Sequence, residues 1–106
     1  VRSILAERGR LVLIPRGENE RCLRRFGLTR ESLRLILLGL DLDSYHSGPT
    51  PDRDPRFKGM VWIFGTMLGD TEIYIKLKIR PDQVVCLSFH EANHPLKYPF
   101  RNRRRP

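Results

Sequence analysis

The sequence predicts an α+β fold in which N-terminal helices pack on a small antiparallel β-sheet. An apolar stripe with helical spacing lies in the first half, and segments with alternating apolar and polar residues fill the second half. Short turns join these segments, which favours an antiparallel meander. The chain has 106 residues, of which 40% are hydrophobic, so it is long enough for one domain with a modest core.

The first elements are short. A helix is expected over residues 1–9, with Gly9 as its stop. The stretch "RLVLIPR" is rich in β-branched residues and closes on a proline, which is typical of a strand. The stretch "GENERCLRRFG" predicts a helix that ends at Gly27 and carries its apolar residues on one side.

The clearest element is the helix in "LTRESLRLILLGL". Thr29 can accept a hydrogen bond from the first free amide groups, and Glu31 complements the positive end of the helix. Apolar residues then recur at spacings of three and four, and this stripe needs a sheet or another helix to cover it. The residues of the stripe are Leu33, Ile36, Leu37 and Leu40.

Residues 41–59 are rich in proline and glycine and predict one long loop. Three strand-like segments follow, "MVWIFG", "TEIYIKLKI" and "QVVCLSFH". The linkers "MLGD" and "RPD" are compatible with hairpins between them. One face of the resulting sheet is expected to lie under the helices, and the other face is expected to be open.

Alternation assigns side chains to the two faces. In the middle strand Ile73, Ile75, Leu77 and Ile79 share the helix-covered face, and Glu72, Tyr74, Lys76 and Lys78 share the open one. In the last strand the alternate set is Val84, Cys86, Ser88 and His90. If this set lies on the open face, His90 is close to Tyr74 or Lys76. His46 lies in the preceding loop, which can hang over the same face.

This inventory suits cleavage of RNA by attack of a 2′-hydroxyl on the neighbouring phosphate. The reaction needs a base, an acid and cations, and histidine titrates near neutral pH. The catalytic candidates are His46, Tyr74 and His90, and the RNA-binding candidates are Arg56, Lys58, Trp62, Lys76, Lys78 and Arg80. The ordinary alternative is a solvated strand in which the lysines serve solubility, Trp62 is a core residue and His94 is a loop residue.

The charge distribution points to a polyanionic partner. The net charge is +8, and the five cations of residues 97–106 are accompanied by no acids. We therefore divide the chain into a domain over 1–96 and a basic tail over 97–106. The tail can bind a polyanion or simply be solvated.

Metal and cofactor sites are not expected. Cys86, His90 and His94 recur at intervals of four, but residues at this spacing do not converge on a strand. Cys22 and Cys86 match no paired-cysteine pattern and are expected to be reduced, structural thiols. No apolar stretch reaches the ~20 residues that span a bilayer, and no secretory-type segment is seen, so a cytoplasmic protein without membrane contact is expected.

The order and spacing of four stretches resemble those of a known protein family. The stretches are "LLGLDLDSYHS", "VWIFG", "EIYIKLKI" and "VVCLSFHE". They resemble the MqsR (motility quorum-sensing regulator) family of type II toxins, which look like RelE-type ribonucleases. The matching family features are a helix ending in Gly-Leu, an Asp-x-Tyr-Lys-Ser loop, a Val-Tyr-Leu-Lys strand and a final strand ending in Ser-Phe-Lys. The resemblance runs from Val1 to about Glu91 and does not include the basic tail.

The resemblance implies a metal-independent endoribonuclease (an mRNA interferase) that a cognate antitoxin neutralises. The family's strand tyrosine falls on Tyr74, and its two functional lysines fall on His46 and His90. The family's glutamine near the tryptophan has no counterpart around Trp62. Whether the ribosome takes part, and which histidine acts as the base, stay open.

Two other functions fit the same sequence. The first is a non-catalytic RNA- or DNA-binding module that uses the open sheet face and the basic tail. The second is a protein-interaction module whose open face is covered by another chain.

Overall fold

The computed structural model describes residues 10–51 and 59–100. Over this part of the chain it shows two α-helices and one five-stranded sheet, which confirms the α+β class. The helix expected over 1–9 lies outside the described residues. The elements are β1 (Arg10–Leu13), α2 (Gly17–Arg25), α3 (Arg30–Leu38), a 3₁₀ turn (Leu42–Ser44), β2 (Tyr45–Pro51), β3 (Met60–Leu68), β4 (Thr71–Arg80) and β5 (Gln83–Glu91).

The sheet is mixed, so the prediction of a purely antiparallel sheet is wrong at one edge. The strand order is β1-β5-β4-β3-β2, and β2 to β5 are antiparallel to their neighbours. β1 instead runs parallel to β5, with Leu11 opposite Val84. Parallel pairing needs a long connection between the two strands, and the whole rest of the fold separates β1 from β5 in the chain.

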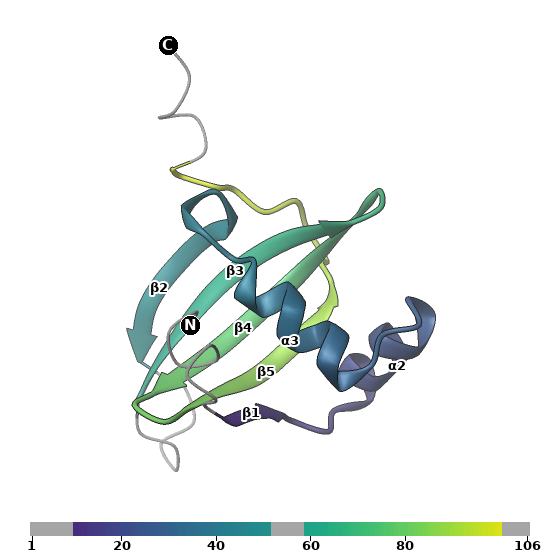
Figure 1. Ribbon diagram of the computed structural model, residues 1–106. Helices are drawn as coiled ribbons and strands as arrows, with labels where there is room; N and C mark the ends of the chain where they lie inside the picture. Colours follow the sequence, from purple (N-terminus) through teal and green to yellow (C-terminus); the bar gives the residue numbers. More distant parts are fainter. Residues whose placement is uncertain (1–9, 52–58, 101–106) are drawn as a thin grey trace.

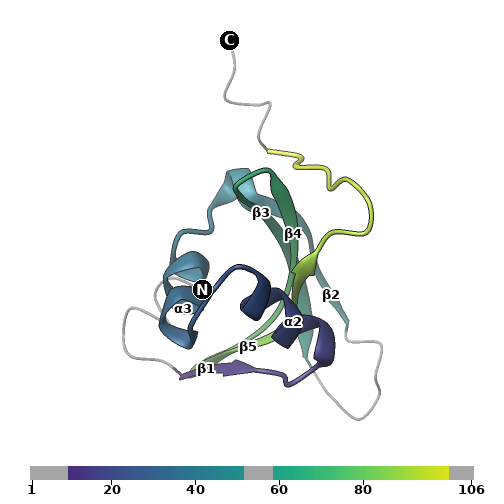
Figure 2. The ribbon, with the colours of Figure 1, turned by 90° about the vertical axis from the view of Figure 1, so that its right-hand side faces the viewer.

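Both helices end and begin where the sequence predicts. α2 is followed by Gly27, which has a positive φ, and α3 begins after Thr29, whose side chain accepts a hydrogen bond from the amide of Ser32 at 3.1 Å. In the α3 stripe, Leu33 and Leu37 are fully buried. α3 therefore presents its apolar stripe to the core. Figure 1 and Figure 2 show the helix lying against one face of the sheet.

The core lies between α3 and one face of the sheet. β4 alternates as predicted, and Ile73, Ile75 and Leu77 are completely buried in this core. Two-residue turns at Gly69-Asp70 and Pro81-Asp82 join β4 to its neighbours. Gly69 has a φ of 64°, the left-handed conformation that such hairpin turns favour.

The segment predicted as one long loop contains a strand. Tyr45–Pro51 pairs with β3 as the edge strand β2, although its register is interrupted on both sides of Ser47. Irregular edge strands of this kind are compatible with the proline and glycine that led to the loop prediction. Residues 52–58 of the predicted loop lie outside the described residues.

β5 contains a bulge that changes the faces of its side chains. Lys76 of β4 pairs with Ser88, whereas the next residue, Leu77, pairs with Cys86, so Leu87 is the extra residue. Phe89, Cys86 and Val84 therefore all face the helices, each fully buried. The prediction that Val84 and Cys86 share the open face with His90 is wrong, because the bulge breaks the alternation between Cys86 and Ser88.

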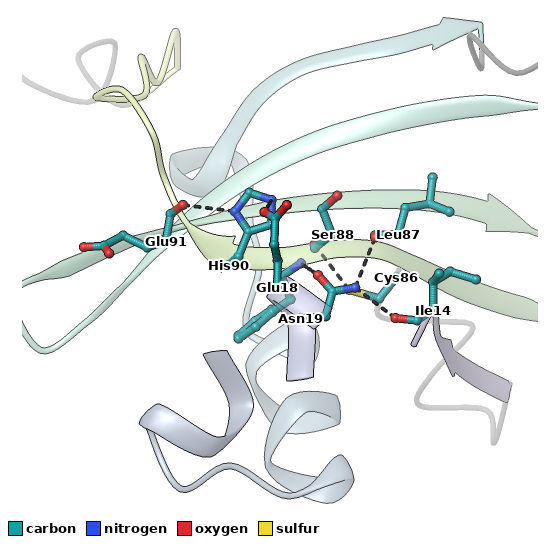
Figure 3. A network of polar contacts seen from close by, with 9 residues as sticks. Ile14, Glu18, Asn19, Cys86, Leu87, Ser88, His90 and Glu91 are labelled. Atoms are coloured by element: carbon teal, nitrogen blue, oxygen red, sulfur yellow. Dashed lines mark hydrogen bonds and ion pairs between the residues drawn. The ribbon is translucent and has the colours of Figure 1, made fainter. Parts of the chain in front are cut away.

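A buried asparagine on α2 completes this bulge. β1 covers the edge of β5 only from Gln83 to Cys86. Beyond that point Asn19, which is fully buried, accepts a hydrogen bond from the amide of Phe89 at 2.9 Å and donates to the carbonyls of Leu87 and Ile14 at 3.2 and 2.9 Å. Figure 3 shows this network. Asn19 thus replaces a missing strand neighbour, since buried backbone groups need partners.

Candidate active site

Tyr74 and His90 lie side by side on the sheet face away from α3. The two residues are directly opposite in the β4–β5 ladder, and their rings stack with centroids 5.4 Å apart and planes at 21°. The sequence-based expectation that His90 lies near Tyr74 therefore agrees with the structure. Stacking on a half-buried tyrosine restricts the orientation of the imidazole ring.

Both ring nitrogens of His90 face oxygen atoms. Nδ1 lies 3.0 Å from the carbonyl oxygen of Glu91, and Nε2 lies 3.5 Å from a carboxylate oxygen of Glu18 on α2. Figure 3 shows the imidazole between these two groups. Because a carbonyl and a carboxylate only accept hydrogen bonds, this environment suits an imidazole that carries protons on both nitrogens. His90 is therefore placed to give up a proton.

His46 resembles His90 at Nδ1, which also faces a backbone carbonyl, but it differs at Nε2. It lies in β2, and its Nδ1 is 2.6 Å from the carbonyl oxygen of Lys97. That oxygen can only accept, so Nδ1 carries a hydrogen, and in the neutral ring Nε2 then has a lone pair. Nε2 makes no hydrogen bond with the described residues. In its neutral form His46 can therefore take up a proton at Nε2.

All three catalytic candidates line one cleft of about 550 Å³. Its walls come from the first turn of α2, from β2, β4 and β5, and from the segment after β5. His94, expected to be an ordinary loop residue, lies in this segment and lines the cleft as well. The lining residues are Glu18, His46, Tyr74, His90, Asn93, His94, Pro95 and Leu96.

The segment over residues 92–100 forms one wall of the cleft, so this sheet face is not fully open. Glu72 of β4 holds the segment by accepting hydrogen bonds from the amide of Leu96 at 2.9 Å and from the hydroxyl of Tyr98 at 2.7 Å. Gly65 of β3 leaves room for it, because a methyl group there would clash with the Tyr98 hydroxyl. In Figure 2 the segment, coloured yellow, lies across the sheet from α3.

The same segment includes part of the predicted tail. Residues 97–100 contact the sheet through the Lys97 carbonyl, the Tyr98 hydroxyl and the ring of Phe100, which lies 5.2 Å from that of Tyr45. Residues 101–106 lie outside the described residues. The described start of the basic tail is therefore packed against the domain.

The RNA-binding candidates are not brought together at the cleft. Lys76 is on the same face as Tyr74, two positions or ~7 Å along β4. Arg80 is exposed at the far end of the strand, roughly 20 Å from Tyr74. Arg56 and Lys58 lie outside the described residues.

Two of these candidates differ from the expectation: Lys78 lies on the expected face but is buried, and Trp62 lies on the other face. Lys78 is only 3% exposed, and its aliphatic carbons lie against Gly59. Its side chain is therefore buried and does not extend into solvent. Trp62 is paired with Leu77 and therefore shares the helix-covered face, opposite to that of Tyr74. Both errors arise because the alternation of a strand gives relative faces and does not show which parts of a face are covered.

The cysteines do not contribute a reactive thiol. Burial raises the pKa of the Cys86 thiol from 9.0 to about 12, and burial also raises the pKa of Cys22. Both thiols are therefore neutral near neutral pH and poor nucleophiles.

Glu18 and Asn19 are the site residues that the sequence analysis did not identify. They occupy the first turn of α2, where an acidic residue has the ordinary explanation of favourable interaction with the helix N-terminus. Glu18 contacts His90, and Asn19 holds the β5 bulge; both partners are about 70 residues away in the chain. Periodicity within one element carries no signal of such a contact.

Within the described residues, no group of three or more histidine, cysteine or acidic side chains is arranged to hold a metal ion. The described part of the chain also has no helix of the length and apolar character needed to cross a membrane.

Comparisons of the chain with protein-family models, curated proteins and solved structures found no significant match.

Proposed function

We propose that this protein is a metal-independent endoribonuclease. The observation that supports the proposal is the single cleft that contains His46, Tyr74 and His90, with one histidine suited to accept a proton and the other to donate one. Complementary acid and base groups in one cleft are what cleavage of a phosphodiester by its own 2′-hydroxyl requires.

The contacts of the two rings support the following division of roles. Nε2 of His46 takes the proton from the ribose 2′-hydroxyl, and the resulting oxygen attacks the adjacent phosphorus. His90 donates its Nε2 proton to the departing 5′-oxygen. The products are a 2′,3′-cyclic phosphate on one fragment and a free 5′-hydroxyl on the other, with the proton balance conserved. Tyr74 keeps the His90 ring in position by stacking.

The biological role in the proposal is that of a type II toxin. It is supported by the sequence motifs that resemble the MqsR and RelE-type toxins, and the α+β architecture is compatible with them. On this proposal the substrate is messenger RNA in the cytoplasm, free or on the ribosome, and a cognate antitoxin blocks the cleft.

The test uses purified protein and a single-stranded RNA in the presence of a metal chelator. We expect cleavage with cyclic phosphate ends, and a fall of about 100-fold or more in the cleavage rate for His46→Ala and for His90→Ala. His94→Ala is the matched control, because His94 lines the same cleft and has no assigned role in proton transfer. Its cleavage rate should stay near that of the unaltered protein.

Two results would contradict the enzymatic proposal. Loss of cleavage on chelation would exclude a metal-free reaction. Salt-sensitive RNA binding without any cleavage, unchanged by His46→Ala, would instead favour the non-catalytic binding module.

A further inference from the structure

A second groove adjoins the cleft on the far side of His90. It has a volume of about 240 Å³ and shares three wall residues, Glu18, His90 and Asn93, with the cleft. The remaining wall comes mainly from α2. The two hollows are therefore neighbours that meet at Glu18, His90 and Asn93. The groove is lined by Glu18, Arg21, Cys22, Arg25, Phe26, His90, Glu91 and Asn93.

The two hollows differ in their cations. No lysine or arginine side chain is among the described residues that line the cleft, whereas Arg21 and Arg25 line the groove. These arginines are four residues apart on α2 and so lie on the same helix face, one turn from each other. Two guanidinium groups thus lie beside His90, in a groove that Glu18 and Glu91 also line.

Both arginines can bind a phosphate. Arg25 pairs with Glu91 at 3.2 Å, but the two side chains are 56% and 59% exposed, and such surface pairs are weak enough to exchange. The Arg25 guanidinium also lies 5.1 Å from the centroid of the Phe26 ring, which holds its plane in place. Arg21 forms no ion pair with the other residues described by the structure.

We propose that Arg21 and Arg25 form a phosphate subsite for the RNA strand on the 3′ side of the cleaved bond. This inference rests on the proposed function, because the direction follows from the roles of the histidines. His90 protonates the 5′-oxygen of the departing nucleotide, so that nucleotide lies next to His90. The groove beyond His90 then receives the following phosphate, for which the planar guanidinium groups are well suited.

The experiment measures binding of an RNA that cannot be cut because its reacting ribose lacks the 2′-hydroxyl. Fluorescence anisotropy over a series of salt concentrations compares Arg21→Ala with Arg24→Ala, an exposed arginine of the same helix that lines neither hollow. We expect Arg21→Ala to bind about tenfold more weakly and to lower the salt slope by about one. Arg24→Ala should match the unaltered protein, and equal behaviour of the two variants would overturn the subsite.

A shortened RNA makes the test specific to one phosphate. It ends at the nucleoside directly after the uncut bond and therefore lacks the following phosphate. We expect Arg21→Ala and the unaltered protein to bind this RNA equally. A tenfold loss with the short RNA as well would contradict the proposed position of the subsite.

The two proposals fail in different ways. If unmodified RNA is never cut but Arg21→Ala still weakens binding only of the longer RNA, the enzymatic proposal fails and a phosphate subsite on α2 is retained. If unmodified RNA is cut and Arg21→Ala behaves as Arg24→Ala, the subsite fails and the enzyme is retained.

Discussion

The two faces of the sheet are built by different interactions. Against α3, the row formed by Ile75 and Phe89 is fully buried among apolar side chains. On the opposite face, the adjacent row formed by Tyr74 and His90 lies in a cleft whose wall is held by hydrogen bonds to Glu72. Adjacent residue pairs of β4 and β5 therefore lie in different environments. Ile75 and Phe89 belong to the apolar core, and Tyr74 and His90 belong to the polar cleft.

This difference separates stability from function. Burial of apolar surface is the dominant favourable contribution to folding, and it is concentrated on the α3 side. The cleft face holds groups whose hydrogen bonds contribute less to stability but fix the orientation of two histidines. Substitutions on the two faces should therefore have different consequences, and this expectation can be tested in order of decreasing effect.

The largest effect is expected for Phe89→Ala on the α3 side. Removal of a fully buried ring leaves a cavity, and the free energy of unfolding should fall by about 3–5 kcal/mol. Its chain neighbour His90, on the cleft face, is the matched comparison, and His90→Ala should cost less than about 1 kcal/mol. Denaturant unfolding measures both values, and similar losses would show that the two faces are not distinct.

An intermediate effect is expected for Asn19→Ala. Asn19 binds the β5 bulge, where the alternation of side chains between the two faces is interrupted. The change leaves the Phe89 amide and two carbonyls without their partner, so the free energy of unfolding should fall by about 3 kcal/mol. Glu20→Ala, an exposed neighbour on α2, should stay within about 0.5 kcal/mol. Faster hydrogen exchange at the Phe89 amide should accompany the loss; unchanged exchange would mean that Asn19 does not hold the bulge.

The smallest effect is expected for Tyr98→Phe on the cleft face. Loss of one partly buried hydrogen bond to Glu72 should cost about 1 kcal/mol. Because the segment can open locally, the change should appear as about fivefold faster hydrogen exchange at the Leu96 amide, with global unfolding nearly unchanged. Lys97→Ala, with an exposed side chain, is the control. A drop in global stability of several kcal/mol would indicate that this wall is part of the core.

Local patterns predicted much of this architecture. The alternation of β4, the Thr29 cap of α3 and the two hairpin turns depend on residues close together in the chain, and each is seen in the structure. The opposition of Tyr74 and His90 does not follow from the turn alone: the register set by the Pro81-Asp82 turn would place Phe89 opposite Tyr74, and the bulge at Leu87 shifts the pairing by one residue to His90.

Other features depend on contacts between distant residues. The β5 bulge exists because Asn19 on α2 provides partners for its backbone, and the parallel position of β1 depends on the free edge of β5. Lys78 and Trp62 differ from the expectation for a related reason: the coverage of a face is decided by what packs on it.

The sequence by itself determined the class of fold, the pairing of the central strands and the presence of histidine, tyrosine and arginine side chains for acid–base chemistry and anion binding. Only the tertiary structure decided that His46 meets the Lys97 carbonyl, that His90 meets Glu18, and that both line one cleft. The physical reason is that propensity and periodicity act over a few residues, whereas Lys97 and Glu18, which contact these histidines, come from distant parts of the chain.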